Sequence, residues 1–258
     1  MKSACAWAVV LSCLSTSLFA EETLEEKLSH APPILRVEED WEVVVADPEP
    51  ENDLPQIVTV FGPTDAAFGT HTVFELNHGT LPDYTQGGMQ LQVWWSNALV
   101  GYKAQFAPVE LHVVGEVITY TTVTRLNRSE NILTMEVVNG HSVTHGNFGS
   151  GDGLLRLRMY TFRDHLNPYN PNNSIAYSRV TYGANKVNRF VRKAIRFYDE
   201  DGLYCEDNTR TYVHRLATDV QLEQASTTAG TSGTSSTSTS SGTGSSDPVA
   251  SETGTTTP

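Results

Sequence analysis

The sequence MQLQVWW, residues 89–95, alternates apolar and polar side chains with a period of two. In a β-strand, alternate side chains lie on opposite faces of the sheet, whereas an amphipathic helix repeats about every 3.6 residues. This stretch therefore predicts a strand with one face in a core. The residues expected to face the core are Met89, Leu91, Val93 and Trp95, and those expected to face outward are Gln90, Gln92 and Trp94.

Runs of the same kind recur from Ile34 onward, and clusters of Gly, Pro, Asn and Asp separate them. Strands are predicted over residues 35–46, 56–61, 71–76, 89–95, 98–106, 117–125, 132–138, 154–160, 175–182, 191–198 and 211–216. No amphipathic helix interrupts them, so the pattern predicts an all-β fold, a two-sheet antiparallel β-sandwich of the jelly-roll type. The pairs Asn139-Gly140 and Asp201-Gly202 predict tight hairpin turns, because both supply the positive φ angles that such turns need.

The two ends of the chain differ in composition from its middle. Lys2, the apolar run after it and the small residues that follow predict a signal peptide, cleaved after Ala20 or after Ser17. The apolar run is shorter than the roughly 20 residues of a membrane span, so we expect a secreted, periplasmic or cell-surface protein without one. The C-terminal Ser/Thr/Gly-rich segment predicts disorder. The expected division is a signal peptide over residues 1–20, a polar linker over 21–33, a β-sandwich domain over 34–225 and a disordered tail over 226–258.

Charge is unevenly distributed along the chain, whose formal net charge is −13. Twelve acidic residues and two basic ones lie between Glu21 and Asp53, whereas eleven Lys or Arg and six acidic residues lie between Leu154 and Arg215. This asymmetry predicts that the acidic N-terminal segment lies against the basic C-terminal half. Nucleic acid is not an expected partner, because phosphate binding requires a positive field. Only Cys205 remains after signal removal, so no internal disulfide is expected.

The outward-facing side chains of the predicted strands indicate a sugar-binding surface. The candidate ligand-binding residues are Trp94, Gln90, Gln92, Arg156, Arg158 and Tyr160. If their strands are neighbours, aromatic rings, amides and guanidinium groups share one exposed face. An aromatic ring can stack on the apolar face of a pyranose, while amides and arginines hydrogen-bond its hydroxyls. The alternative is that a loop covers Trp94, which is then an ordinary buried aromatic residue.

Three carboxylates at alternate positions, Glu38, Asp40 and Glu42, project from one face of the first predicted strand. They resemble the E-x-D-x-E signature of family 16 glycoside hydrolases, jelly-roll enzymes whose first and last carboxylates act as nucleophile and acid/base. Side chains two apart on a strand can approach the ~5 Å that retaining hydrolysis requires. Glu39 departs from that family, which has an apolar core residue there. The alternative is an acidic outer face on an edge strand that discourages pairing between sheets.

Histidines do not indicate a metal site. On a strand, His141 and His145 would lie about 13 Å apart, too far for one zinc ion to bridge. The other histidines are scattered without ligand spacing. No metal and no cofactor are therefore expected.

Three short runs carry a resemblance to a known group: DWEVVV at 40–45, PQ at 55–56 and YGANKVN at 182–188. They resemble uncharacterised secreted proteins of planctomycete-type bacteria, and the strand pattern is similar to concanavalin-A-like and laminin-G-like jelly rolls. The resemblance implies secretion and a jelly-roll sandwich over roughly residues 34–215. It implies no activity.

The sequence therefore predicts a secreted, non-enzymatic β-sandwich that binds a glycan or another cell-surface component. Two alternatives stay open. One is a jelly-roll glycoside hydrolase that uses Glu38 and Glu42, and the other is a structural envelope protein without a ligand site. An exposed flat sheet carrying Trp94 favours the binding protein, whereas a first strand deep in a cleft favours the hydrolase.

Overall fold

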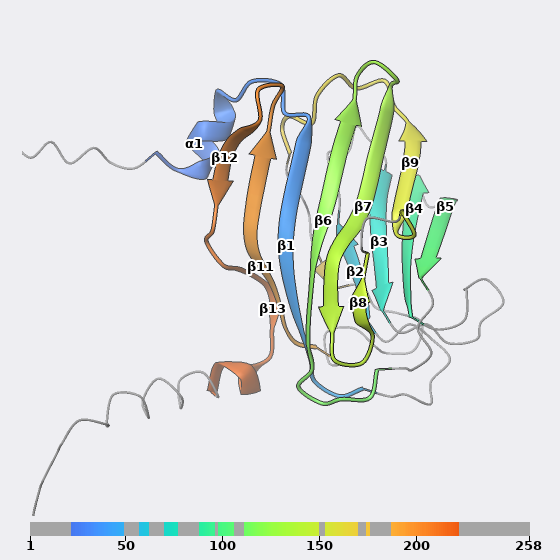
Figure 1. Cartoon of the computed structure of the whole chain (residues 1–258). Coiled ribbons are helices and arrows are strands. Elements are labelled where there is room, and N and C mark those ends of the chain that lie inside the picture. Colours follow the sequence, from blue (N-terminus) through green and yellow to red (C-terminus); the bar gives the residue numbers. More distant parts are fainter. Residues whose placement is uncertain are drawn as a thin grey trace, which may run out of the picture. The chain divides into compact units, whose positions relative to one another are not determined.

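The computed structural model contains two antiparallel sheets (Figure 1). The structure describes residues 22–48, 57–61, 70–76, 88–95, 98–105, 111–149, 153–169, 174–175 and 187–221. The expected signal peptide and tail lie outside these residues. The chain divides into two units, Met1–Asp219 and Val220–Pro258, and both sheets belong to the first. No helix among the described residues is long and apolar enough to cross a membrane.

The larger sheet has eight strands in the order β12-β11-β1-β6-β7-β8, with β13 paired to β11 and β9 paired to β7. Its strands are β1 (Arg36–Val45), β6 (Val117–Asn127), β7 (Ile132–Ser142), β8 (Gly146–Phe148), β9 (Arg156–Tyr160), β11 (Val187–Tyr198), β12 (Leu203–Asp207) and β13 (Thr211–Arg215). β1 pairs with β11 along its whole length, so the two ends of the domain meet inside one sheet.

The smaller sheet has five strands in the order β10-β2-β3-β4-β5. Its strands are β2 (Ile57–Phe61), β3 (Thr70–Leu76), β4 (Met89–Trp95), β5 (Ala98–Gln105) and β10 (Ser174–Ile175). All pairings in both sheets are antiparallel, which confirms the predicted all-β, two-sheet sandwich. The likeness to concanavalin-A-like jelly rolls stays a prediction.

Side chains of both sheets build the core between them. Trp41 of β1 stacks on Phe190 of β11, with ring centroids 4.6 Å apart. Phe74 of β3 meets Tyr120 of β6 edge-on at 5.0 Å. The alternation in β4 places its apolar residues in this core as predicted, namely Met89, Leu91 and Val93. Period-two patterning therefore identified the inner face of β4 correctly.

Trp95 does not follow the rest of β4. Its side chain is 59% exposed, so the prediction that it faces the core is wrong. β4 ends at this residue, and its sheet neighbours Thr70 and Ala98 are themselves the first residues of their strands. Trp95 thus lies at the margin of the sheet, where alternation no longer guarantees burial.

One of the two predicted hairpin turns is a different feature. Asn139 and Gly140 lie inside β7, at a register shift in its pairing with β6, so the prediction of a turn there is wrong. Asn139 does have a positive φ of 54°, which a bulge uses as readily as a turn. Asp201-Gly202 forms the β11–β12 turn as predicted, with a Gly202 φ of 127°.

The segment expected to be a polar linker contains a short helix, α1 (Leu24–Ser29). Thr23 caps it, because the Thr23 side chain accepts from the Glu26 amide while the Glu26 carboxylate accepts from the Thr23 amide. Leu24 and Leu28 pack against the buried cluster that includes Val37 of β1 and Phe197 of β11. A helix of this length is unstable alone, so this packing stabilises it.

Ion pairs join the acidic N-terminal strand to the basic C-terminal strand. Arg189 Nε of β11 lies 2.9 Å from Glu42 of β1. Arg196 Nη1 of β11 lies 2.8 Å from Asp40 of β1. The prediction drawn from the charge asymmetry of the sequence is therefore confirmed.

Candidate functional site

The six predicted ligand-binding residues fall into two groups. The first group, on β4 of the smaller sheet, is Gln90, Gln92 and Trp94, and the second, on β9 of the larger sheet, is Arg156, Arg158 and Tyr160. Core-facing Val93 of β4 and Leu157 of β9 line one small cavity between the sheets. The two outward-facing groups therefore point away from each other. The structure does not bring the six residues together, because β9 pairs with β7 rather than with β4.

The β4 group is a buried polar network. Gln90 and Gln92 are only 1% and 3% exposed, and Trp94 is half-buried. Gln92 Nε2 donates to Glu75 Oε2 of β3 at 2.9 Å, and Trp94 Nε1 donates to Gln92 Oε1 at 2.8 Å. Burial raises the pKa of Glu75 to about 8. The amides expected to meet sugar hydroxyls thus bind one another and a carboxyl group.

Arg156 and Arg158 of the β9 group line a polar pocket on the outer face of β6, β7 and β9. The pocket has a volume of about 270 Å³, and its polar lining residues are Arg125, Asn127, Thr134, Glu136, Arg156 and Arg158. The register creates it, because Thr134 of β7 lies opposite both Arg125 of β6 and Arg158 of β9. Outward-facing positions of three adjacent strands therefore form one continuous surface, which we name the arginine face.

The arginine face contains two ion pairs and one arginine outside them. Arg156 Nη2 donates to Glu136 Oε1 at 2.6 Å. Arg158 Nη2 donates to Glu130 at 2.7 Å, but both of these side chains are more than half exposed, so water competes with this pair. Arg125 is exposed, and no carboxylate of the described residues forms an ion pair with it. Donors of Arg125 and Arg158 are thus accessible to a ligand.

An exposed aromatic pair lies beside the arginine face. Tyr160 is 58% exposed and lies opposite Ile132, which lines the pocket. Phe162 is 90% exposed and meets the Tyr160 ring edge-on, with centroids 5.1 Å apart. Sequence reasoning identified Tyr160 but missed Phe162, which lies just beyond the end of β9. The sequence feature that could have identified Phe162 is its position two residues after Tyr160, another aromatic residue.

The three alternating carboxylates of β1 bind arginines. The partners are Arg36 and Arg196 for Glu38, Arg196 for Asp40, and Arg189 and Arg210 for Glu42. β1 lies between β11 and β6, so the interpretation of the acidic row as protection of an edge strand is wrong. The row instead joins β1 to the C-terminal part of the sheet.

The pKa values of Glu38 and Asp40 do not favour either residue as the general acid of a glycoside hydrolase. Burial raises the pKa of Asp40, but hydrogen bonds from Arg196 and Thr121 lower it by more, so the pKa lies below its ordinary value. The pKa of Glu38 is lowered likewise, because the hydrogen bond from Tyr198 and the charge of a neighbouring arginine outweigh its burial. A glycosidase needs one carboxyl group with a raised pKa as general acid. Neither Glu38 nor Asp40 meets this requirement.

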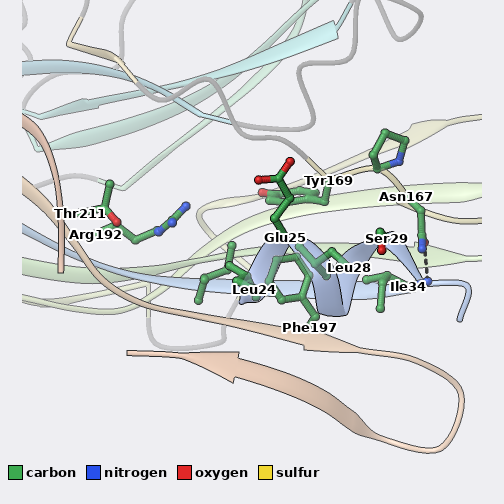
Figure 2. A pocket seen from close by; sticks show the side chains of 12 residues that line it. Leu24, Glu25, Leu28, Ser29, Ile34, Asn167, Tyr169, Arg192, Phe197 and Thr211 are labelled. Atoms are coloured by element: carbon green, nitrogen blue, oxygen red, sulfur yellow. Dashed lines mark hydrogen bonds between the residues drawn. The ribbon is translucent and has the colours of Figure 1, made fainter. Parts of the chain in front are cut away.

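A larger cavity, of about 690 Å³, lies between α1 and β11 (Figure 2). None of the predicted site residues lines it. Its polar lining includes Arg192 of β11, whose Nη1 lies 3.4 Å from buried Glu39 of β1. The sequence did carry a signal for this cavity, because Glu39 falls in the core-facing register of β1 between Val37 and Trp41.

The described residues contain no group of three or more His, Cys, Asp or Glu side chains placed to hold a metal ion. The arrangement as a whole offers hydrogen bonding and stacking on the arginine face, and apolar packing in the cavity.

No protein-family model, curated protein or solved structure matches this chain.

Proposed function

We propose that this protein is a secreted, non-enzymatic β-sandwich that binds a glycan through the arginine face. The observation that carries the proposal is that a polar pocket lies next to the exposed aromatic pair of Tyr160 and Phe162. Secretion is proposed on the N-terminal sequence alone.

The chemistry of this surface fits a sugar. A pyranose ring presents hydroxyls at its rim and C–H groups on its faces, so it needs hydrogen-bonding groups next to an aromatic ring. Guanidinium groups, an amide, a threonine hydroxyl and a carboxylate line the pocket, and Tyr160 lies at its margin. When a ligand covers exposed aromatic surface of this kind, the burial contributes favourably to the free energy of binding.

The same pocket favours binding over hydrolysis. Glu136 is the carboxylate that lines it, and Arg156 binds that carboxylate directly. Glycoside hydrolysis requires two carboxyl groups on either side of the scissile bond. Rigid strands position every lining residue, which suits recognition without chemical change.

A glycan array with the full mature chain tests the proposal, followed by calorimetric titration of the best-bound sugar. We expect Tyr160→Ala and Phe162→Ala to weaken binding by about tenfold or more, since each removes a stacking surface. Arg158→Ala is expected to weaken binding by a similar factor through loss of hydrogen bonds.

Two control variants match these in chemistry but lie elsewhere. Tyr102 is 49% exposed on β5 of the other sheet, and the half-exposed Arg210 binds Glu42. Tyr102→Ala and Arg210→Ala are expected to bind the sugar within about twofold of the wild type. Absence of any glycan binding, or equal losses in the control variants, would reject the arginine face as the site and favour the structural envelope protein.

A further inference from the structure

Strand pairing places the basic residues of the arginine face in one row across the sheet. The row contains four outward-facing residues at paired positions, one each on β1, β6, β7 and β9: Arg36, Arg125, Thr134 and Arg158. Side chains at paired positions project side by side from the same face of a sheet. Figure 1 shows β1, β6 and β7 next to one another in this order. This row, which we name the arginine row, extends the arginine face by one strand.

The length of the arginine row suits an oligosaccharide rather than a single sugar. Neighbouring strands lie about 4.8 Å apart, so the backbone positions of Arg36 and Arg158 are separated by about 14 Å. One pyranose ring is shorter than this. A chain of several sugars that lies across the strands can therefore contact the row at more than one point.

Within the strands, carboxylates flank the arginine row on one side only. In the neighbouring row toward the middle of the strands, Glu38 of β1 and Glu136 of β7 lie opposite the same residue of β6. In the row on the other side, Ile132 lies opposite Asn127 and Tyr160, and none of these three residues is charged. A ligand that lies along the arginine row and Tyr160 therefore meets guanidinium groups and an aromatic ring.

Positive charge exceeds negative charge on the arginine face. Three arginines line the pocket, Arg125, Arg156 and Arg158, against one carboxylate, that of Glu136, which binds Arg156. Glu130 of the β6–β7 turn binds Arg158, but both side chains are more than half exposed, so a ligand can displace this pair. Arg125 is exposed and forms no ion pair with a carboxylate of the described residues. The face is thus locally basic on a chain whose formal net charge is −13.

Arg36 is held in place at one end of the arginine row. Its guanidinium lies over the Tyr198 ring, with Cζ 4.0 Å from the ring centroid, and its Nη2 donates to Glu38. The Arg36 side chain is nevertheless 34% exposed. A guanidinium that is already fixed loses little conformational entropy when a ligand binds it.

We infer that the glycan bound at the arginine face is acidic, an oligosaccharide whose rings carry carboxylate or sulfate groups. This inference rests on the proposed function and names the class of sugar. The oxyanions accept hydrogen bonds from Arg125 and Arg158, because a guanidinium can bind an oxyanion through two parallel bonds, and Tyr160 stacks on a neighbouring ring. A neutral glycan would cover Arg125 without compensating its charge, which makes binding of a neutral glycan less favourable.

Charge-matched pairs of hexasaccharides test the inference by calorimetric titration of the full mature chain. One pair is oligogalacturonate and its uncharged methyl ester, and the other is a κ-carrageenan oligosaccharide and its desulfated form. An acidic glycan selected by the array is compared with its neutralised form in the same way. We expect the acidic member of a bound pair to bind about tenfold more tightly than its neutral partner. Raising the salt concentration from about 50 mM to about 500 mM should weaken the binding of the acidic member by about tenfold.

The outcomes separate this inference from the proposed function. Equal affinities within the pairs that bind, or binding confined to neutral glycans on the array, would overturn the inference and leave glycan binding standing. No binding of any glycan, on the array or in either pair, would reject both.

Arg125→Gln tests the charge while keeping a hydrogen-bond donor. We expect this variant to weaken binding of the acidic member by about tenfold and of its neutral partner by only about twofold. Arg210→Gln is the matched control, because the half-exposed Arg210 binds Glu42 at the other end of β1, and its affinity for the acidic member should stay within about twofold of the wild type. Equal losses for both members of the pair in Arg125→Gln would show that the charge of Arg125 does not select the ligand.

Glu130→Gln tests the same surface by a gain of affinity. This change removes the carboxylate that competes with a ligand for Arg158, so the affinity for the acidic member should rise by about two- to fivefold. Glu206→Gln is the control, because Glu206 lies on β12 and pairs with Arg196 instead. No gain in Glu130→Gln, or the same gain in Glu206→Gln, would reject Arg158 as a contact of the acidic group.

Discussion

Arg196 holds Asp40 through two parallel hydrogen bonds, from Nη1 to Oδ2 at 2.8 Å and from Nη2 to Oδ1 at 2.9 Å. The two residues are 156 positions apart, on β11 and β1. A planar guanidinium matches a carboxylate in this geometry, and a lysine cannot reproduce it. The contact thus links the first strand of the domain to its last long strand with a defined orientation.

Replacement of this arginine should destabilise the fold even when the charge is kept. We expect Arg196→Lys to lower the free energy of unfolding by about 1–3 kcal/mol, because a lysine cannot form both hydrogen bonds of this partly buried bidentate pair. Arg158→Lys, in the exposed pair with Glu130, should change it by less than about 1 kcal/mol. Urea unfolding of both variants measures the difference. Equal effects would mean that the bidentate geometry of Arg196 contributes nothing.

Acid should weaken the same contact. The pKa values of Asp40 and Glu38 are lowered in the folded protein, since hydrogen bonds and arginine charges outweigh the burial that raises them. A carboxylate of this kind contributes stability above its unfolded pKa, and the contribution is lost as the pH falls through its folded pKa. The Asp40→Asn variant should therefore lose less stability than the wild type between pH 5 and pH 3. Parallel unfolding curves over that interval would contradict the lowered pKa.

Glu75 should have the opposite pH dependence. Burial raises its pKa from 4.5 to about 8, so between these values the folded protein holds a proton that the unfolded chain releases. The stability that this extra proton gives the folded protein is largest below pH 4.5. It declines as the pH rises, by at most about 1.4 kcal/mol per pH unit. We expect Glu75→Gln to gain stability relative to the wild type as the pH increases from 5 to 8. Glu130→Gln, at an exposed position, is the control and should show no such trend.

The sequence predicted most of the strands because their signal is local, but it predicted no strand at β8 or at β12. Period-two alternation located β4 to the residue, and the charge asymmetry predicted that the acidic N-terminal segment lies against the basic C-terminal half, as the ion pairs between β1 and β11 show. The capping residue Thr23 and the spacing of Leu24 and Leu28 were also local signals, but a six-residue helix needs tertiary packing that no short pattern reveals.

The candidate site was only half predictable because strand pairing is not local. Alternation showed that Gln92 and Arg158 both face outward from their strands, yet it could not show that β4 and β9 belong to different sheets. It also could not show that the outer side of β4 is covered, which turns Gln90 and Gln92 into a buried network. Whether a strand face is buried depends on segments that are remote in sequence, so the period-two alternation within one strand cannot predict it.

Gly140 should tolerate no side chain. A Cβ at this position would lie 2.1 Å from Cδ2 of Phe148, which is fully buried opposite it on β8. We expect Gly140→Ala to lower the free energy of unfolding by about 1–3 kcal/mol through overpacking. Gly101→Ala is the matched control in a strand, since its Cβ would meet Leu157 at 3.8 Å, an ordinary contact. Thermal unfolding of the two variants checks this, and similar melting temperatures would show that Phe148 can move aside.

The tryptophans of the chain should differ widely in their contribution to stability. Trp41 is 1% exposed, stacks on Phe190 and donates through Nε1 to the Thr122 hydroxyl at 3.0 Å, so Trp41→Ala should lower the free energy of unfolding by about 3–5 kcal/mol. Trp95 is 59% exposed at the end of β4, so Trp95→Ala should change it by less than about 1 kcal/mol. Alternation in β4 assigns Trp95 to the core, whereas of these two rings the structure places only Trp41 there. Denaturant midpoints of the two variants distinguish the two assignments, because a large loss in Trp95→Ala would show that the end of β4 is packed rather than exposed.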